Sequence, residues 1–151
     1  MPLLTDEHRA WIGQEEPPVT VEVSRRDIQK YSSATEQTQE KYINGDEAPP
    51  MFVFNLLSNI PALSALRPDG LMRSTTPGPN LPLKRIMAGG TELHIHRPIR
   101  PGDVLVGTRK MVDIYEKEGK SGPLIFTVNK LSITTSDNEP VMEEIQTAIA
   151  R

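Results

Sequence analysis

The chain has 151 residues, of which 36% are hydrophobic and 25% charged, so we expect one soluble domain over residues 1–151. Its net charge of −3 argues against nucleic acid as a main partner, because phosphate contacts require a basic surface. The absence of cysteine excludes disulfides, thiolate nucleophiles and cysteine-ligated metals. The first residues lack the pattern of a signal peptide, and no apolar stretch reaches the ~20 residues that span a bilayer. We therefore expect a cytoplasmic protein that does not enter a membrane.

The first third of the chain predicts two helices and a strand. Thr5 can cap a short helix that ends at Gly13. The segment VTVEV at 19–23 alternates apolar and polar residues, as a half-buried strand does. The next segment begins with Ser24 at capping-box spacing from an aspartate, which predicts a helix as far as about residue 36. Residues 37–50 are polar and end in EAPP, and we expect a loop there.

The middle of the chain combines an apolar segment with a long irregular one. Residues 51–66, MFVFNLLSNIPALSAL, are apolar around the whole circumference of a helix, which predicts a buried central helix. Pro61 would end or kink this helix. Residues 67–84 are rich in proline and glycine, and a loop of this length in a small domain is usually functional or disordered.

The rest of the chain predicts four β-strands separated by turns rich in glycine, proline or polar residues. The expected ranges are 88–97, 103–117, 123–135 and 140–150. The 103–117 strand is long enough to require strong twist or a bulge. The apolar residues change parity within 123–135, which indicates a bulge near Asn129 or burial of both faces. This order of elements predicts an α+β hot-dog fold, in which an antiparallel sheet wraps around a central apolar helix.

Two histidines and two glycines are the most distinctive residues of the segment RIMAGGTELHIHRPIRPGD. His94 and His96 lie two apart in a predicted strand, so both project from one face. Glu92 shares that face and could complete a metal site, but an ordinary strand face explains the pattern better, and we expect no metal. Gly89 and Gly90 indicate a tight turn or bulge, or else a close approach of the backbone to a ligand.

The sequence lacks the local signatures of several enzyme classes. It has no G-x-S-x-G elbow and no phosphate-binding loop. Hot-dog hydratases add water to an enoyl thioester with a carboxylate and an imidazole at Asp-x4-His. No aspartate of this chain is followed by histidine five positions later. The pattern therefore excludes this dyad from the chain.

Several motifs in a fixed order carry a resemblance to a known family. They are WIG at 11–13, VSRRDIQKYSSAT at 23–35, APPMF at 48–52, RIMAGGTELHIHRPIRPGDVL at 85–105, YEKEGKSGPLIF at 115–126 and EEIQTAIAR at 143–151. With these motifs the chain resembles the first half of MaoC-like acyl-CoA dehydratases, the FAS1-like dehydratase domain. Among the members of this family, the motifs are most similar to those of mesaconyl-C4-CoA (3-methylfumaryl-CoA) hydratases.

The resemblance implies a function shared between two subunits. In that family two hot-dog halves form one unit, and the second half supplies the aspartate and the histidine. This chain would then be the non-catalytic, acyl-binding half of an enoyl-CoA hydratase or 3-hydroxyacyl-CoA dehydratase. It would pair with a second hot-dog subunit that carries Asp-x4-His, act on acyl-CoA or acyl-carrier thioesters, and need no cofactor. A homodimer that binds acyl thioesters, or a hydratase that uses His96 with a carboxylate, is the alternative.

The resemblance also suggests the residues that contact the substrate. We expect no catalytic residue in this chain, and His96 is the one to test if this is wrong. The expected substrate-binding residues are Met87, Gly89, Gly90, His94, Arg97 and Arg85. The arginines among them suit the phosphates of CoA or surface ion pairs. Asp103 is expected to cap a turn, and Trp11 and Tyr31 to pack on helix faces.

Overall fold

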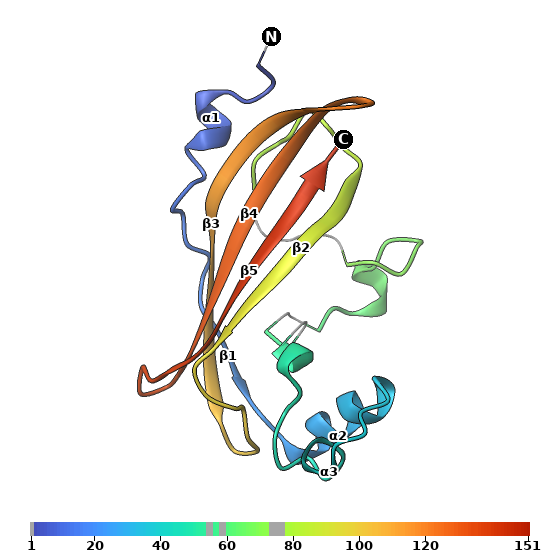
Figure 1. Cartoon of the computed structure of the whole chain (residues 1–151), viewed down its shortest axis with the longest axis vertical. Helices are drawn as coiled ribbons and strands as arrows, with labels where there is room; N and C mark the ends of the chain where they lie inside the picture. The colour runs from blue at the N-terminus through green and yellow to red at the C-terminus, as the bar shows by residue number, and fades with distance from the viewer. Residues whose placement is uncertain (1, 54–55, 58–59, 73–77) are drawn as a thin grey trace.

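The computed structural model describes residues 2–53, 56–57, 60–72 and 78–151, and its main element is a curved antiparallel sheet (Figure 1). The strands lie side by side in the order β1-β3-β4-β5-β2. Their bounds are β1 Val19–Glu22, β2 Ile86–Ile95, β3 Val104–Gly119, β4 Gly122–Thr135 and β5 Pro140–Ala150. The expected α+β class and the antiparallel sheet are confirmed, and each predicted strand is found within a few residues of its expected range.

The N-terminal segment forms one short helix and then follows the edge of the sheet. Helix α1, Asp6–Arg9, begins after Thr5, whose N–H donates to Nδ1 of His8 at 2.9 Å. The helix ends earlier than expected, because the chain turns toward β3. Gly13 has a φ of 84° and donates its N–H to the carbonyl of Met111. This attachment holds residues 11–17 beside β3.

Helix α2, Arg25–Ala34, starts as the sequence predicts. The hydroxyl of Ser24 accepts a hydrogen bond from the N–H of Asp27 at 3.0 Å, and Ile28 on the buried face is fully covered. The expected loop at 37–50 contains one further short helix, α3, Glu40–Ile43. Both helices lie at one end of the sheet (Figure 1). None of the helices in the described ranges is long and apolar enough to cross a membrane.

The turn after α3 depends on a glycine. Gly45 has a φ of 72°, and a Cβ atom there would lie 2.8 Å from the carbonyl oxygen of Arg25. We expect Gly45→Ala to lower the free energy of unfolding by about 2 kcal/mol, because the left-handed conformation and the contact with backbone both oppose a side chain. Gly13→Ala is the matched control, since Gly13 has a similar φ and open space around it. Equal losses in urea unfolding for the two variants would contradict the steric contribution.

The apolar segment at 51–66 does not form the buried helix that its composition predicts, as far as the described residues extend. It begins with a 3₁₀ turn, Pro50–Val53, and ends with another, Leu63–Ala65, while residues 54, 55, 58 and 59 lie outside the described ones. Pro61 removes a backbone donor and restricts the residue before it to extended conformations. Ile60 is accordingly 99% exposed and does not cover the sheet.

The long strand β3 carries the bulge that its length predicts. Its register with β4 shifts between Met111 and Asp113. The shift lies opposite Asn129 and Val128, so a bulge is present near Asn129 but on β3, and the pairing of β4 with β5 is regular from Ile125 to Ile133. The change of parity in β4 therefore reflects apolar residues on both faces of the sheet, which was the other alternative.

Two hydrophobic clusters occupy the same face of the sheet, which we call the inner face. The main core cluster joins the sheet to α2 and the middle segment, and its buried members are Val23, Ile28, Ala48, Phe52, Val53, Leu57, Ile99, Leu105, Leu131, Ile133, Val141 and Met142. The second core cluster lies at the other end of the strands and consists of Leu4, Ile114, Ile125 and Ala150. The candidate site lies on the inner face between these two clusters.

Candidate functional site

A row of polar side chains crosses the inner face between the two core clusters. Asn129 on β4 is paired with Gln146 on β5, and Gln146 is paired with Thr91 on β2. Residues that are paired across antiparallel strands point to the same face, so the three side chains form one line. We call Asn129, Gln146 and Thr91 the polar row. Asn129 and Gln146 are half-buried and Thr91 is exposed, so these polar groups can offer hydrogen bonds to a ligand that lies on the inner face.

A buried carboxylate lies beside the polar row. Glu144 is two residues from Gln146 on β5, shares its face, and is 5% exposed. Its strand neighbours on that face are Leu131 and Leu93. Its Oε1 has no hydrogen-bond partner within the described ranges. Burying a carboxylate without a partner costs free energy, so packing of the core alone does not explain Glu144.

A cavity opens on the inner face next to the polar row. Its volume is about 660 Å³, within the ~300–1,000 Å³ range of small-molecule sites. The sheet contributes Met111, Thr127 and Asn129, so the cavity shares one residue with the polar row. The other walls come from the N-terminal segment and the loop before β2, and they are Trp11, Gln14, Glu15, Glu16, Pro17, Gly78, Pro79 and Leu81.

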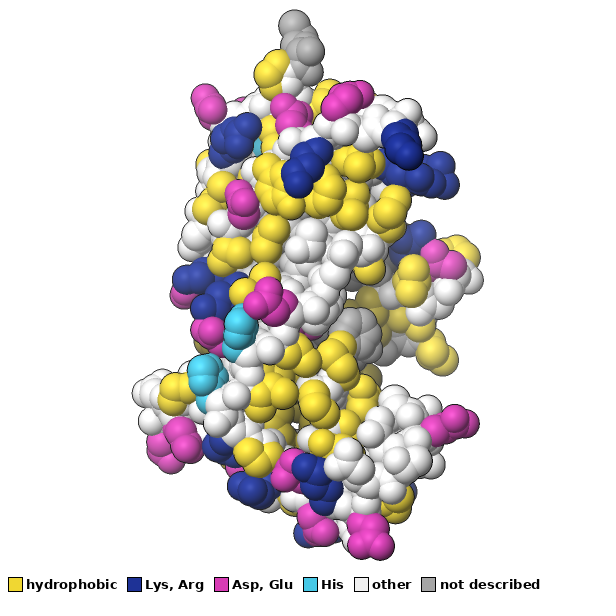
Figure 2. All heavy atoms as spheres, viewed as in Figure 1, with side chains coloured by type: hydrophobic (Ala, Val, Ile, Leu, Met, Phe, Trp, Pro, Cys, Tyr) yellow, Lys and Arg dark blue, Asp and Glu magenta, His cyan; other side chains and the backbone are white. Residues whose placement is uncertain are grey.

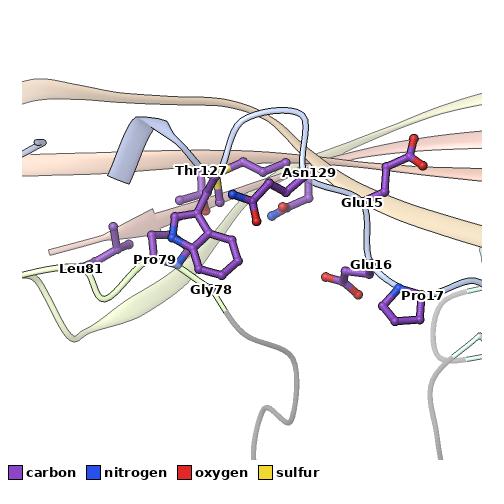
Figure 3. A pocket seen from close by; sticks show the side chains of 11 residues that line it. Glu15, Glu16, Pro17, Gly78, Pro79, Leu81, Thr127 and Asn129 are labelled. Carbon is purple, nitrogen blue, oxygen red and sulfur yellow. The ribbon is translucent and has the colours of Figure 1, made fainter. Parts of the chain in front are cut away.

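Figure 3 shows how the polar groups of this cavity are arranged. Thr127 and Asn129 project from the sheet, whereas Glu15 and Glu16 come from the N-terminal segment and point to different sides. Glu15 lies 3.6 Å from Nζ of Lys110, and Glu16 lies 4.0 Å from a guanidinium nitrogen of Arg109. The cavity is therefore mainly apolar, with amide and hydroxyl groups on its floor and paired carboxylates at its edge.

No described residue that lines this cavity is a histidine, so it contains no imidazole to pair with a carboxylate. His8 lies near the rim, where its Nε2 is 3.2 Å from the carbonyl of Asn80 and its Nδ1 contacts Thr5. Both of its ring nitrogens are thus engaged with the backbone of loops. The described lining residues thus offer two carboxylates, Glu15 and Glu16, but no imidazole to act with them on a water molecule.

His94 in β2 and His96 just after it lie away from this cavity. His94 points to the outer face, where its Nε2 is 2.9 Å from a carboxylate oxygen of Glu92. His96 follows the strand and is exposed, and its N–H donates to the carbonyl of Val141. The described residues contain no group of three or more ligands suited to a metal ion.

The residues expected around the glycine pair also lie on the outer face or at the end of β2. Met87 is paired with Ile149 and is 38% exposed. Gly89 sits at a register shift, and a Cβ atom there would lie 3.0 Å from Cγ1 of Ile149. Gly90 has open space around its Cα, and Arg85 exchanges backbone hydrogen bonds with the C-terminal residue. The structure thus brings these residues near one another but not to the inner cavity.

The guanidinium of Arg97 forms an ion pair with Asp103, so it is not free to bind a phosphate of CoA. Its guanidinium donates to both carboxylate oxygens of Asp103, at 2.9 and 3.2 Å, and Asp103 also accepts from the N–H of Arg100 at 2.8 Å. This contact makes Asp103 the turn cap that the sequence predicts. Arg97 also lines a smaller cavity of about 200 Å³ together with Tyr42 and Met142.

Burial and ion pairing shift the pKa values of Asp103 and Arg97 in opposite directions. Burial raises the pKa of Asp103, but the hydrogen bonds from Arg97 and Arg100 and their positive charges outweigh it, so its pKa lies below the ordinary value of 3.8. The hydrogen bond to Asp103 raises the pKa of Arg97, against the lowering effect of burial. The pair is therefore charged at neutral pH and ties the end of β2 to the start of β3.

Several residues of the site were not singled out from the sequence. Trp11 lines the cavity instead of only packing on a helix face, while Tyr31 does pack, edge to face against Phe52 at 5.7 Å. The sequence pattern does not point to Glu144 or Gln146 as site residues. The signal that could have found them was the run of polar residues in the middle of strands whose ends are apolar on the same face.

Comparison with known proteins agrees with this geometry and identifies the family. The family described as "FAS1-like, dehydratase domain region" matches residues 10–144. The chain belongs to this FAS1-like dehydratase domain family, which is MaoC-like. It is also 29% identical over 154 residues to a protein of Saccharopolyspora erythraea named "UPF0336 protein", with 95% of this chain and 90% of that protein covered.

Solved structures of the same architecture show that the fold is the hot-dog fold. The chain resembles the ChsH1-ChsH2 complex of Mycobacterium tuberculosis, with a TM-score of 0.68 and 16% identity over 96% of this chain and 86% of that one. The HadBC 3R-hydroxyacyl-ACP dehydratase complex of the same organism has a TM-score of 0.65 and 18% identity, and the match covers 93% of this chain and 97% of that one. A MaoC-like dehydratase of Phytophthora capsici has a TM-score of 0.69 and 18% identity, and the match covers 95% of this chain but 50% of that chain.

Proposed function

We propose that this chain is the acyl-binding, non-catalytic subunit of an enoyl-CoA hydratase or 3-hydroxyacyl-CoA dehydratase. The observation that carries the proposal is the inner cavity, which is large enough for an acyl chain and has no histidine among its described lining residues. The sequence, which has no Asp-x4-His, supports the same division of roles. In this proposal a second MaoC-like hot-dog subunit supplies the aspartate and the histidine.

The chemistry assigns a definite task to each subunit. Water addition to an enoyl thioester requires a carboxylate and an imidazole that hold one water, and a donor for the thioester oxygen. The partner would provide these groups. This chain would hold the acyl group between the sheet and the N-terminal segment, so that the double bond is oriented toward the partner's water.

The exposed edge of the sheet supports the pairing with a second hot-dog subunit. Strand β2 lies at the edge in the described part of the chain, and its residues Ile86, Met87 and Ile95 are 62%, 38% and 50% exposed. Figure 2 shows hydrophobic side chains gathered toward both ends of the sheet in this view, with a band of other atoms between them. Edge strands with apolar side chains usually join another strand.

The identity of the acyl group is a finer part of the proposal. The motifs at 85–105 and 115–126 favour a substrate like that of mesaconyl-C4-CoA hydratases, in which the acyl group is short and carboxylated. The uncharged floor of the cavity favours an acyl chain without a carboxylate. Crotonyl-CoA and mesaconyl-CoA are therefore the two substrates to compare.

Reconstitution of the enzyme from two chains tests the proposal. The chain is purified alone and together with a hot-dog protein of the same genome that carries Asp-x4-His, and hydration of both esters is followed. We expect no turnover by this chain alone and turnover by the pair. In the pair, replacing the partner's histidine should abolish turnover, whereas His96→Ala in this chain should leave it unchanged.

Two results would contradict the proposal. The first is turnover by the purified chain alone that is lost in His96→Ala, because this would place the chemistry on β2. The second is a stable homodimer that binds the esters without turnover and takes up no Asp-x4-His subunit at any salt concentration, because this would make the chain a binding protein.

A further inference from the structure

The carboxylate of Glu144 lies in surroundings that do not explain it. Its side chain is 5% exposed, and the residues paired with it on the neighbouring strands are Leu131 and Leu93, both packed in the main core cluster. Its Oε1 lacks a hydrogen-bond partner among residues 2–53, 56–57, 60–72 and 78–151. A carboxylate is normally buried only with a cation or with donors around it.

Two cations among the described residues near this part of the sheet pair with other carboxylates. Lys130 contacts Glu143, which precedes Glu144 on β5 and points to the outer face. Arg109, in the same row as Glu144 but on β3, lies 4.0 Å from Glu16. Among the ion pairs of the described residues, none includes Glu144. A donor from a bound molecule would satisfy the free oxygen.

The position of Glu144 relative to the cavity indicates which part of a ligand would reach it. Glu144 is not itself one of the residues that line the cavity, but Asn129, in the cavity floor, belongs to the row next to Glu144 on the same face. Glu144 is on β5, farther from the wall formed by residues 11–17 than Asn129 is. The nucleotide of CoA is charged and stays in water, so the acyl group is the part of the ester that reaches a site buried in the sheet.

We propose that Glu144, together with the polar row, selects acyl thioesters whose acyl group carries a hydrogen-bond donor, such as a hydroxyl group, away from the thioester. The carboxylate of Glu144 accepts this donor, and the amides of Gln146 and Asn129 accept or donate beside it. The same negative charge disfavours an acyl group that ends in a carboxylate. This inference rests on the proposed function, because it assumes that the cavity binds an acyl thioester.

Matched CoA esters that differ only at the acyl terminus test the inference. At each of three chain lengths, C4, C6 and C8, the terminus is a methyl, a hydroxyl, an ammonium or a carboxylate group. Calorimetry measures binding to the full chain, alone and with its Asp-x4-His partner. We expect the hydroxyl ester to bind at least about tenfold more tightly than the methyl ester at one chain length, because a hydrogen bond to a buried charge would be lost. The ammonium ester tells whether a cationic donor is accepted as well as a neutral one.

Substitutions at Glu144 should reverse this preference. Glu144→Leu matches the leucines on both sides and removes the charge without opening a void, so it should fold and bind the methyl ester more tightly than the hydroxyl ester. Glu144→Gln keeps the shape and should reduce the preference for hydroxyl while it permits the carboxylate ester to bind. Glu143→Gln, one residue away on the outer face, is the control and should leave every ratio unchanged.

The outcomes separate this inference from the proposed function. Equal binding of the methyl and hydroxyl esters, or a preference that survives in Glu144→Leu, would overturn the inference and leave acyl binding intact. Failure of the esters to bind at every chain length and with every terminus, with and without the partner, would overturn both. A melting temperature that rises in Glu144→Leu without ligand supports an unpaired carboxylate, whereas a fall by several degrees would mean that Glu144 has a structural partner.

Discussion

Replacing Asp103 by alanine is expected to lower the free energy of unfolding by about 3 kcal/mol. The carboxylate accepts two hydrogen bonds from Arg97 and one from the backbone of Arg100, and both charged side chains are only about one-fifth exposed. Without Asp103, the guanidinium would keep the carbonyl of Pro98, at 2.9 Å, and Glu139, at 3.4 Å from its Nε. Urea unfolding measures the loss. Asp69→Ala is the control, because Asp69 pairs with Arg67 in water and should contribute less than about 1 kcal/mol.

The contribution of Asp103 should depend on pH in a definite direction. Its pKa in the folded protein lies below 3.8, so the unfolded chain takes up a proton first as the pH falls. The stabilisation is therefore complete above about pH 4 and is lost as the pH falls further, through the folded pKa. We expect the difference in stability between the wild type and Asp103→Asn to shrink from pH 7 to pH 3. An unchanged difference would contradict the ion pair as its source.

Leu105→Ala is expected to lower the free energy of unfolding by about 3 kcal/mol as well. Leu105 is fully buried on the inner face of β3 and is paired with Val21 on the edge strand β1. Its truncation leaves a void in the main core cluster, where the strand and the middle segment meet. Scanning calorimetry should record a decrease of about 6–12 °C in the melting temperature.

The neighbouring residue is a suitable control for this substitution. Val104 precedes Leu105 in β3, points to the other face and is 38% exposed. Val104→Ala should therefore cost less than about 1 kcal/mol. A similar loss for both variants would mean that the outer face of β3 is as closely packed as the inner one.

The strands were predictable because their pattern is local. Alternation at 19–23 and the turn residues between 97 and 140 define each strand, and the capping pair Ser24 and Asp27 defines the start of α2. These signals depend on a few neighbouring residues, so tertiary contacts do not override them. The length of the 103–117 segment likewise predicted the bulge that β3 carries.

The middle segment and the site were not predictable in the same way. Composition alone favoured a helix over 51–66, but Pro61 and the exposed Ile60 show that the segment is not buried along its whole length. The polar row depends on the register of three strands, and a sequence without pairing information does not give that register. The type of residue alone makes His94 a candidate site residue. Gln146 becomes one only through its pairing with Asn129 and Thr91, which the sequence does not reveal.

In the described part of the chain, β2 is an edge strand, and this affects how much of the protein can stay in solution when it is produced in a cell. Ten residues of backbone, Ile86–Ile95, can add a strand from any chain that offers one. In the proposed two-subunit enzyme, a chain made in excess of its partner would offer this edge to other copies of itself. Under the proposed function, we therefore expect a larger soluble yield of this chain when the Asp-x4-His subunit is made with it than when it is made alone.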